Sequence, residues 1–129
     1  MIGVEELLVF FVGAAGYGLI EILWRGYTHW TMLVTGGICL LVLYKAFEML
    51  RGGKLIIKCL LGGLIITTAE LIIGMIVNVE LGLDVWDYSE MPMNLYGQIC
   101  LLYSFFWTLL CYPAVFLCRV IKRFVSRYS

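Results

Sequence analysis

The stretch KCLLGGLIITTAELIIGMIVN, residues 58–78, decides the fold class of this chain. Between its two end residues it contains one charged side chain, that of Glu70. A helix crosses the hydrocarbon core of a bilayer with about 20 predominantly apolar residues, and this stretch has that length. We therefore predict a transmembrane helix that carries a carboxyl group inside an apolar segment.

Three further apolar runs in the chain have a similar length. The 129 residues are 63% hydrophobic and have a mean hydropathy of +0.99, whereas soluble domains are about 45–50% apolar. A chain this short could not bury so much apolar surface from water. We expect an all-α, polytopic membrane protein, a single four-helix transmembrane domain over residues 1–129. Its spans are expected at about residues 7–24, 32–50, 55–79 and 95–118.

The charged residues are distributed unevenly between the connections. Basic side chains gather around the second connection and in the C-terminal tail: Lys45, Arg51, Lys54, Lys58, Arg119, Lys122, Arg123 and Arg127. The third connection carries acidic charges without Lys or Arg: Glu80, Asp84, Asp87 and Glu90. The positive-inside rule then predicts that the second connection and both termini lie in the cytoplasm and the acidic loop outside.

The composition also excludes several kinds of function. The formal net charge is zero and there is no continuous basic face, so nucleic acid is not an expected partner. The five cysteines lie in or beside apolar runs, without a C-x-x-C pair, which indicates small buried side chains. We expect no metal site and no cofactor. RGGK at residues 51–54 is not a P-loop, so this chain does not hydrolyse ATP by a Walker mechanism.

The third span carries a stripe of small and polar residues, which we call the third-span stripe: Gly63, Thr67, Glu70, Gly74 and Asn78. Their spacings of +4, +3, +4 and +4 place them on one helix face. A carboxyl group facing lipid costs several kcal/mol, so this face should point into the protein, where small residues let another helix approach. The alternative to a functional carboxyl group is a packing seam in which Glu70 is hydrogen-bonded.

The first span repeats this arrangement nearer its outer end, where Ala14, Gly18, Glu21 and Arg25 follow the same +4, +3, +4 spacing. Glu21 and Arg25 have the order and separation that favour an ion pair on one helix face. In the alternative interpretation, Arg25 extends to the lipid headgroups with Glu21 as its partner.

Polar and aromatic residues near the outer ends complete the expected site. Asn94 and Gln98 are four residues apart on the predicted fourth helix, so they could face one cleft. We predict that a small polar solute or cation is bound by Glu21, Arg25, Glu70, Asn78, Asn94 and Gln98. The expected rim consists of His29, Trp30, Trp86, Asp87 and Tyr88. The acidic loop lacks the frame of a calcium-binding loop, so no metal role is assigned to it.

Three segments resemble the CmpB-like family of ABC-transporter permeases: YGLIEILWRGYTHWTM (17–32), ELIIGMIVN (70–78) and LDVWDYSEMPMNLYGQICLLYSFFW (83–107). The resemblance extends over about residues 13–119. It implies a small multi-pass protein of the bacterial inner membrane with about four helices, and it offers no catalytic set. The residues of this chain that match the family pattern are Glu21, Arg25, His29, Trp30, Glu70, Asn78, Trp86, Asp87, Tyr88, Asn94 and Gly97. Because a four-span chain is smaller than a typical ABC permease, transport would need oligomers or partner chains.

Three functions fit these features. The first is transport or solute binding in an outward-facing polar site, with the lipid bilayer, a second copy of the chain and an ATPase or other transporter subunit as partners. The second is an enzyme acting on a lipid-linked or amphipathic substrate, with Glu70 or His29 as base and Arg25 holding a phosphate or carboxylate. The third is a structural or accessory subunit, whose Gly-lined faces favour a homodimer.

Overall fold

The computed structural model describes residues 3–128, so residues 1, 2 and 129 of the expected domain lie outside it. Four long helices account for most of the described chain: α1 (Val4–Arg25), α2 (Trp30–Met49), α3 (Leu55–Gly74) and α4 (Leu101–Tyr128). Each lies in a segment that is long and apolar enough to cross a membrane. The predicted four-helix membrane bundle is therefore confirmed.

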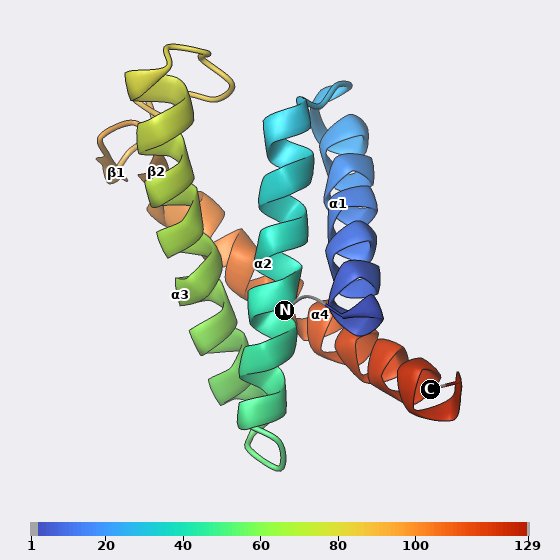
Figure 1. Cartoon of the computed structure of the whole chain (residues 1–129). Coiled ribbons are helices and arrows are strands. Elements are labelled where there is room, and N and C mark those ends of the chain that lie inside the picture. Colours follow the sequence, from blue (N-terminus) through green and yellow to red (C-terminus); the bar gives the residue numbers. More distant parts are fainter. Residues whose placement is uncertain (1–2, 129) are drawn as a thin grey trace.

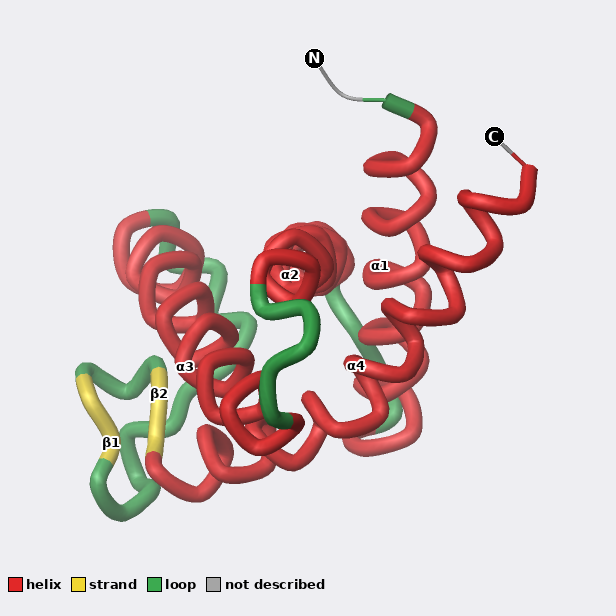
Figure 2. The backbone as a smooth tube through the Cα atoms, turned by 90° about the horizontal axis from the view of Figure 1, so that it is seen from below, coloured by secondary structure: helices red, strands yellow, loops and turns green. Residues whose placement is uncertain are grey.

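The helices associate mainly as two hairpin-like pairs, α1 with α2 and α3 with α4, and α2 also contacts α3. Helix α4 crosses the others obliquely, and its C-terminal end comes to lie on the same side of the molecule as the beginning of α1 (Figures 1 and 2). Nζ of Lys122 in α4 lies 3.4 Å from Oε1 of Glu5 in α1, which links these two ends.

Close packing of α1 on α2 depends on glycine. A Cβ atom at Gly13 would lie 2.6 Å from the carbonyl oxygen of Gly36, so a side chain there would force the helices apart. The hairpin reverses at Gly26, which has φ +83° and donates its N–H to the carbonyl oxygen of Ile22. This left-handed backbone conformation ends α1, and glycine adopts it with little steric strain because it has no Cβ atom.

Helix α3 continues as a π-helical segment, η1 (Met75–Glu80). The chain then forms an irregular loop over residues 81–93 and a short antiparallel pair, β1 (Asn94–Leu95) and β2 (Ile99–Cys100), before α4 begins. Figure 1 shows this loop and the two strands gathered at one end of the bundle. The loop closes on the end of α3: Val77, Val85, Trp86 and Met32 of α2 form a small buried cluster.

The fourth helix begins at Leu101, whereas the apolar run predicts a helix from about residue 95. Tyr96 and Gly97 have φ values of +57° and +71°, which an α-helix cannot contain. The N–H of Gly97 donates to Oδ1 of Asn94. Asn94 therefore lies in β1 and Gln98 in the turn that follows it, and the expectation that they share a helix face is wrong.

The main buried cluster lies between all four helices toward the opposite end of the bundle and includes Val9, Leu43, Cys111 and Val115. Large apolar side chains also cover the outer surface; Leu23, for example, is 78% exposed. Such a surface is ordinary for helices that face lipid tails. The polar groups inside the bundle are therefore the features that require a separate explanation.

Candidate functional site

Two adjoining, partly open cavities lie between the helices. The inner cavity has a volume of about 300 Å³ and is lined mainly by apolar side chains, together with Glu70. The outer cavity has a volume of about 430 Å³ and is rich in aromatic residues, with Glu21 and Arg25 in its wall. Six residues line both cavities: Tyr17, Ile20, Met32, Trp86, Trp107 and Leu110. The shared wall makes the two spaces neighbours around Tyr17 and Trp107.

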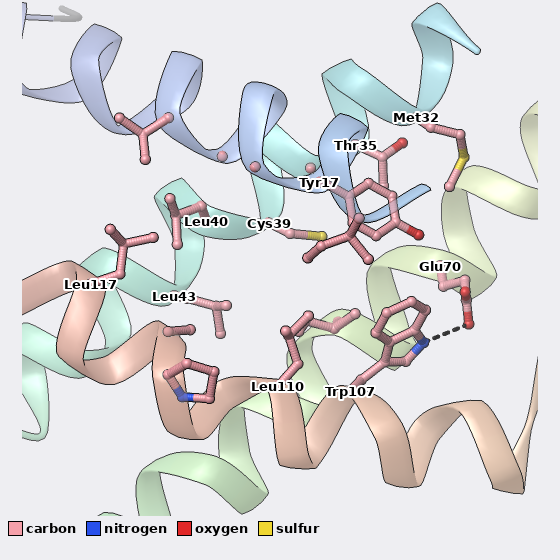
Figure 3. A pocket seen from close by; sticks show the side chains of 18 of the residues that line it. Tyr17, Met32, Thr35, Cys39, Leu40, Leu43, Glu70, Trp107, Leu110 and Leu117 are labelled. Carbon is pink, nitrogen blue, oxygen red and sulfur yellow. Dashed lines mark hydrogen bonds between the residues drawn. The ribbon is translucent and has the colours of Figure 1, made fainter. Parts of the chain in front are cut away.

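Glu70 is only 5% exposed and contributes its carboxylate to the inner cavity. Its Oε1 accepts a hydrogen bond from Nε1 of Trp107 at 3.3 Å, and its Oε2 accepts one from the hydroxyl of Tyr88 at 3.1 Å. In Figure 3, Tyr17, Glu70 and Trp107 lie at one end of the cavity, and Leu40, Leu43 and Leu117 lie toward the other. The cavity therefore has a polar end and an apolar end.

The third-span stripe faces α4 and the loop that precedes it. A Cβ atom at Gly63 would lie 2.0 Å from Oγ1 of Thr108, so the two helices are in close contact there. One turn further along, the hydroxyl of Thr67 donates to Oγ of Ser104 at 3.0 Å. The prediction that small residues on this face admit another helix is confirmed, and the partner is α4.

Glu21 and Arg25 form the expected ion pair on α1, with Nε and Oε2 2.7 Å apart. Nη1 of Arg25 also donates to the carbonyl oxygen of Val85 at 3.0 Å, and its guanidinium lies 4.5 Å from the ring centre of Tyr27. The side chain of Glu21 is 10% exposed and that of Arg25 21%, so both are largely shielded. Among the described residues, Nη2 of Arg25 has no hydrogen-bond partner.

Asn78 and Gln98 hold the acidic loop in place. Nδ2 of Asn78 donates to Oε1 of Gln98 at 2.8 Å, while Oδ1 of Asn78 accepts the N–H of Val85 at 2.7 Å. The indole N–H of Trp86 donates to the carbonyl oxygen of Gln98. Neither amide side chain is part of the lining of the two cavities. Through Val85, these bonds connect with Arg25, so the two residues support the wall of the outer cavity.

Asn94 and Asp87 lie farther from the cavities and stabilise turns. Nδ2 of Asn94 donates to the carbonyl oxygens of Ser89 and Met91. Oδ1 of Asp87 accepts the N–H of Ser89 at 2.9 Å. This hydrogen bond favours the ionised carboxylate and lowers the pKa of Asp87 below its usual 3.8.

His29 and Trp30, two of the expected rim residues, also lie outside the lining of both cavities. His29 is the N-cap of α2, where its Nδ1 accepts the N–H of Thr31 at 3.2 Å. Trp30 is 65% exposed. In contrast, Trp86 lines both cavities and Tyr88 lines the outer one. Burial raises the pKa of Tyr88, so its hydroxyl remains a donor to Glu70.

Several aromatic residues of the cavities were not identified from the sequence. Tyr17 and Trp107 make an edge contact with ring centres 5.9 Å apart, and Tyr103 stacks on Tyr88 at 4.8 Å. Tyr103 and Trp107 are four residues apart and so share a face of α4, which is the signal that could have identified them. In an apolar helix, such aromatic residues are hard to distinguish from ordinary packing residues.

The arrangement offers charge, hydrogen-bond donors and aromatic surfaces in a shielded space. Across residues 3–128, there is no group of three or more His, Cys, Asp or Glu side chains able to hold a metal ion. Five predicted residues line the cavities: Glu21, Arg25, Glu70, Trp86 and Tyr88. Asn78, Gln98 and Asn94 lie outside the cavity linings and form hydrogen bonds that hold the adjoining loop. Such a space can bind a small molecule and hold it by charge.

Residues 8–129 match the family model described as "Putative ABC-transporter type IV", and the chain belongs to this family. The resemblance seen in the three sequence segments is thereby confirmed. No curated protein and no solved structure matches the chain. Together, the family and the four apolar helices identify a multi-pass, transport-type membrane protein.

Proposed function

We propose that this chain provides the solute-binding part of a membrane transport system and that the two cavities are its solute site. Glu21, Arg25 and Glu70 would supply the polar contacts, and Trp86 and Tyr88 would close the site from the loop side. The proposal rests on one observation above all: a buried carboxylate borders a cavity large enough for a small molecule.

The surrounding contacts support a binding role for this space. Glu21 and Arg25 hold each other in a fixed position beside the outer cavity. Nη2 of Arg25 lacks a partner within residues 3–128, so the guanidinium retains a donor that a solute could use. Buried polar groups are normally satisfied, and an exception near a cavity is a reason to expect a ligand.

Asn78, Asn94 and Gln98 have an indirect part in this proposal. Their hydrogen bonds fix the loop that carries Trp86 and Tyr88. They would position the cavity wall, while the solute itself contacts other residues. His29, Trp30 and Asp87 would likewise stabilise the surrounding elements.

We further propose that both termini lie in the cytoplasm of a bacterial cell and that the loop over residues 81–93 lies on the outer side of the inner membrane. The outer cavity, next to this loop, would then receive solute from outside. The sequence contains no P-loop, so coupling to ATP would require an ATPase subunit, and a second copy of the chain is a further expected partner.

The experiment blocks the inner cavity with a side chain. Gly16 lines this cavity, and a Cβ atom there would meet nothing within 4 Å. Gly16→Leu should therefore fill the space without displacing a helix. Ala15→Leu is the matched control, because Ala15 is an exposed neighbour outside both cavity linings.

Radiolabelled rubidium ion, alanine and tetraphenylphosphonium serve as probes, with equilibrium dialysis for binding and counterflow exchange in proteoliposomes for transport. At least one probe should bind saturably and exchange through the wild type and Ala15→Leu. Its affinity for Gly16→Leu should be at least about tenfold lower, equal to about 1.4 kcal/mol. Binding unchanged by Gly16→Leu, or no saturable binding of any probe, would contradict the proposal.

A further inference from the structure

We propose that the solute is an organic cation with an apolar body, which places its positive charge beside Glu70 and its apolar groups in the inner cavity. This inference rests on the proposed function and names the class of solute for the same site. It depends on three features of the cavities: their charge balance, their aromatic walls and the scarcity of other polar groups.

The charge balance leaves the carboxyl group of Glu70 without a counter-ion among the described residues. Glu21 and Arg25 neutralise each other at 2.7 Å. No described Lys, Arg or His side chain forms an ion pair with Glu70, whose two partners, Trp107 and Tyr88, are neutral donors. A buried carboxylate without a cation is costly when ionised. A positively charged solute would offset this cost.

The walls around Glu70 suit a cation that is not strongly hydrated. The rings of Tyr17 and Trp107 meet at the boundary between the two cavities, with centres 5.9 Å apart. In the outer cavity, Tyr88 stacks on Tyr103 at 4.8 Å. Aromatic faces attract cations such as quaternary ammonium groups, and the attraction is larger where water is excluded.

The inner cavity extends from this polar end into an apolar end formed by residues such as Leu40, Leu43 and Leu117 (Figure 3). These side chains offer van der Waals contact and no hydrogen bonds. A solute that reaches from Glu70 into this space gains free energy by burying apolar groups there. The charged part of the proposed solute would therefore lie beside Glu70, and its apolar part would lie at the apolar end of the cavity.

The same features argue against three other classes. Metal cations need several oxygen ligands, and within residues 3–128 no group of three suitable side chains occurs. A highly polar neutral solute would lose hydrogen bonds to water that the apolar walls cannot replace. An ionised Glu70 would repel an anion. The charge of Arg25, the cationic residue in the cavity linings, is already neutralised by Glu21.

Two probes of similar shape and opposite charge test this inference: tetraphenylphosphonium and tetraphenylborate. Their binding to the detergent-solubilised full chain is measured by equilibrium dialysis, with protein-free micelles subtracted. Tetraphenylphosphonium should bind saturably, and tetraphenylborate should bind at least about tenfold more weakly, equal to about 1.4 kcal/mol. Rubidium ion should show no saturable binding.

Glu70→Gln removes the charge; its amide oxygen can still accept the hydrogen bond from Trp107, and its NH2 group can donate to the hydroxyl oxygen of Tyr88. It should lower the affinity for tetraphenylphosphonium at least about tenfold. Glu80→Gln is the matched control, because Glu80 is an exposed carboxyl group at the end of the same helical segment, and affinity should be unchanged.

A second variant keeps the inference testable if Glu70→Gln does not fold. Tyr103→Leu removes an aromatic face without removing a partner of Glu70, and it should lower the affinity for tetraphenylphosphonium by about two- to fivefold. Full affinity in both Glu70→Gln and Tyr103→Leu would overturn the inference.

The outcomes separate this inference from the proposed function. Saturable binding of alanine or tetraphenylborate that is lost in Gly16→Leu, without binding of tetraphenylphosphonium, would overturn the cation class and keep the cavity as a solute site. Failure of every probe to bind would overturn both. Binding of tetraphenylphosphonium that depends on Glu70 and on an open cavity would support both.

Discussion

Nε1 of Trp107 in α4 donates a hydrogen bond to Oε1 of Glu70 in α3, with a nitrogen–oxygen distance of 3.3 Å. This contact joins two helices, lies at the shared wall of the two cavities and orients the carboxylate. Trp107→Phe keeps an aromatic ring and removes the donor. It should lower the free energy of unfolding by about 1–2 kcal/mol.

The measurement is unfolding in mixed micelles followed by tryptophan fluorescence or circular dichroism. Trp30→Phe provides the matched control, because Trp30 is 65% exposed and lies outside the cavity linings, so stability should change little. Equal destabilisation by both substitutions would show that the bond to Glu70 has no specific contribution.

Glycines at two positions should respond in opposite ways to enlargement. Gly63→Leu places a side chain where a Cβ atom would already lie 3.0 Å from Cα of Thr108, so α3 and α4 must separate. The expected loss of stability is about 2–4 kcal/mol, in the range of severe overpacking. Gly16→Leu projects into open space and should keep the wild-type fold, as measured by thermal unfolding and size-exclusion chromatography. Similar stability of the two variants would contradict the close packing at Gly63.

The ion pair of Glu21 and Arg25 should show a measurable coupling energy. Removing either partner alone leaves the other charge largely shielded and unpaired, so each single variant, Glu21→Gln or Arg25→Gln, should lose about 1–3 kcal/mol of stability. The double variant should lose less than the sum of the two. Additive losses in this double-mutant cycle would mean that the pair contributes nothing beyond its separate members.

The acidic loop should lose stability in acid through Asp87. The hydrogen bond from Ser89 holds the pKa of Asp87 below its usual 3.8. A group with a lowered folded-state pKa stabilises the fold above its unfolded-state pKa, and this contribution is lost as the pH falls through the folded-state value. Stability should therefore decline below about pH 4, and Asp87→Asn should flatten this decline. An identical acid profile in the variant would refute the assignment to Asp87.

The proposed orientation predicts which loops react with a membrane-impermeant maleimide in intact bacterial cells. The five native cysteines are buried and are replaced to give a background without thiols. Asp84→Cys should then be labelled from outside, whereas Arg51→Cys should be labelled only after the membrane is permeabilised. The reverse pattern would invert the proposed topology.

Some features of the site were predictable because they follow from local periodicity. The third-span stripe and the pairing of Glu21 with Arg25 depend on the i, i+3 and i, i+4 geometry of a helix, which neighbouring residues alone define. The partner of the stripe, α4, which it contacts through Thr67 and Ser104, became clear only from the tertiary structure. The family could be identified for a related reason, since its segments are local in the sequence.

Other features were predicted wrongly because a turn or a helix cap formed where the residue spacing or residue type suggested a site. Asn94 and Gln98 have helical spacing and lie in an apolar run, yet positive φ values at Tyr96 and Gly97 make a turn there. His29 resembles a site residue in the sequence, but it caps α2. The sequence suggested two alternatives for Glu70, a hydrogen-bonded packing residue or a functional carboxyl group. They are compatible, because Glu70 accepts two hydrogen bonds and also lines a cavity.

The amino-acid sequence alone was enough to predict the four apolar helices, the position of their polar faces and the family of the chain. Those properties follow from apolar length and helical periodicity, which a single segment expresses without its neighbours. The tertiary structure decided which partners the polar groups meet: Trp107 and Tyr88 for Glu70, Val85 for Arg25, and each other for Asn78 and Gln98. The reason is physical: hydrogen bonds and cavities between helices depend on how the helices cross and on how the loop folds over them.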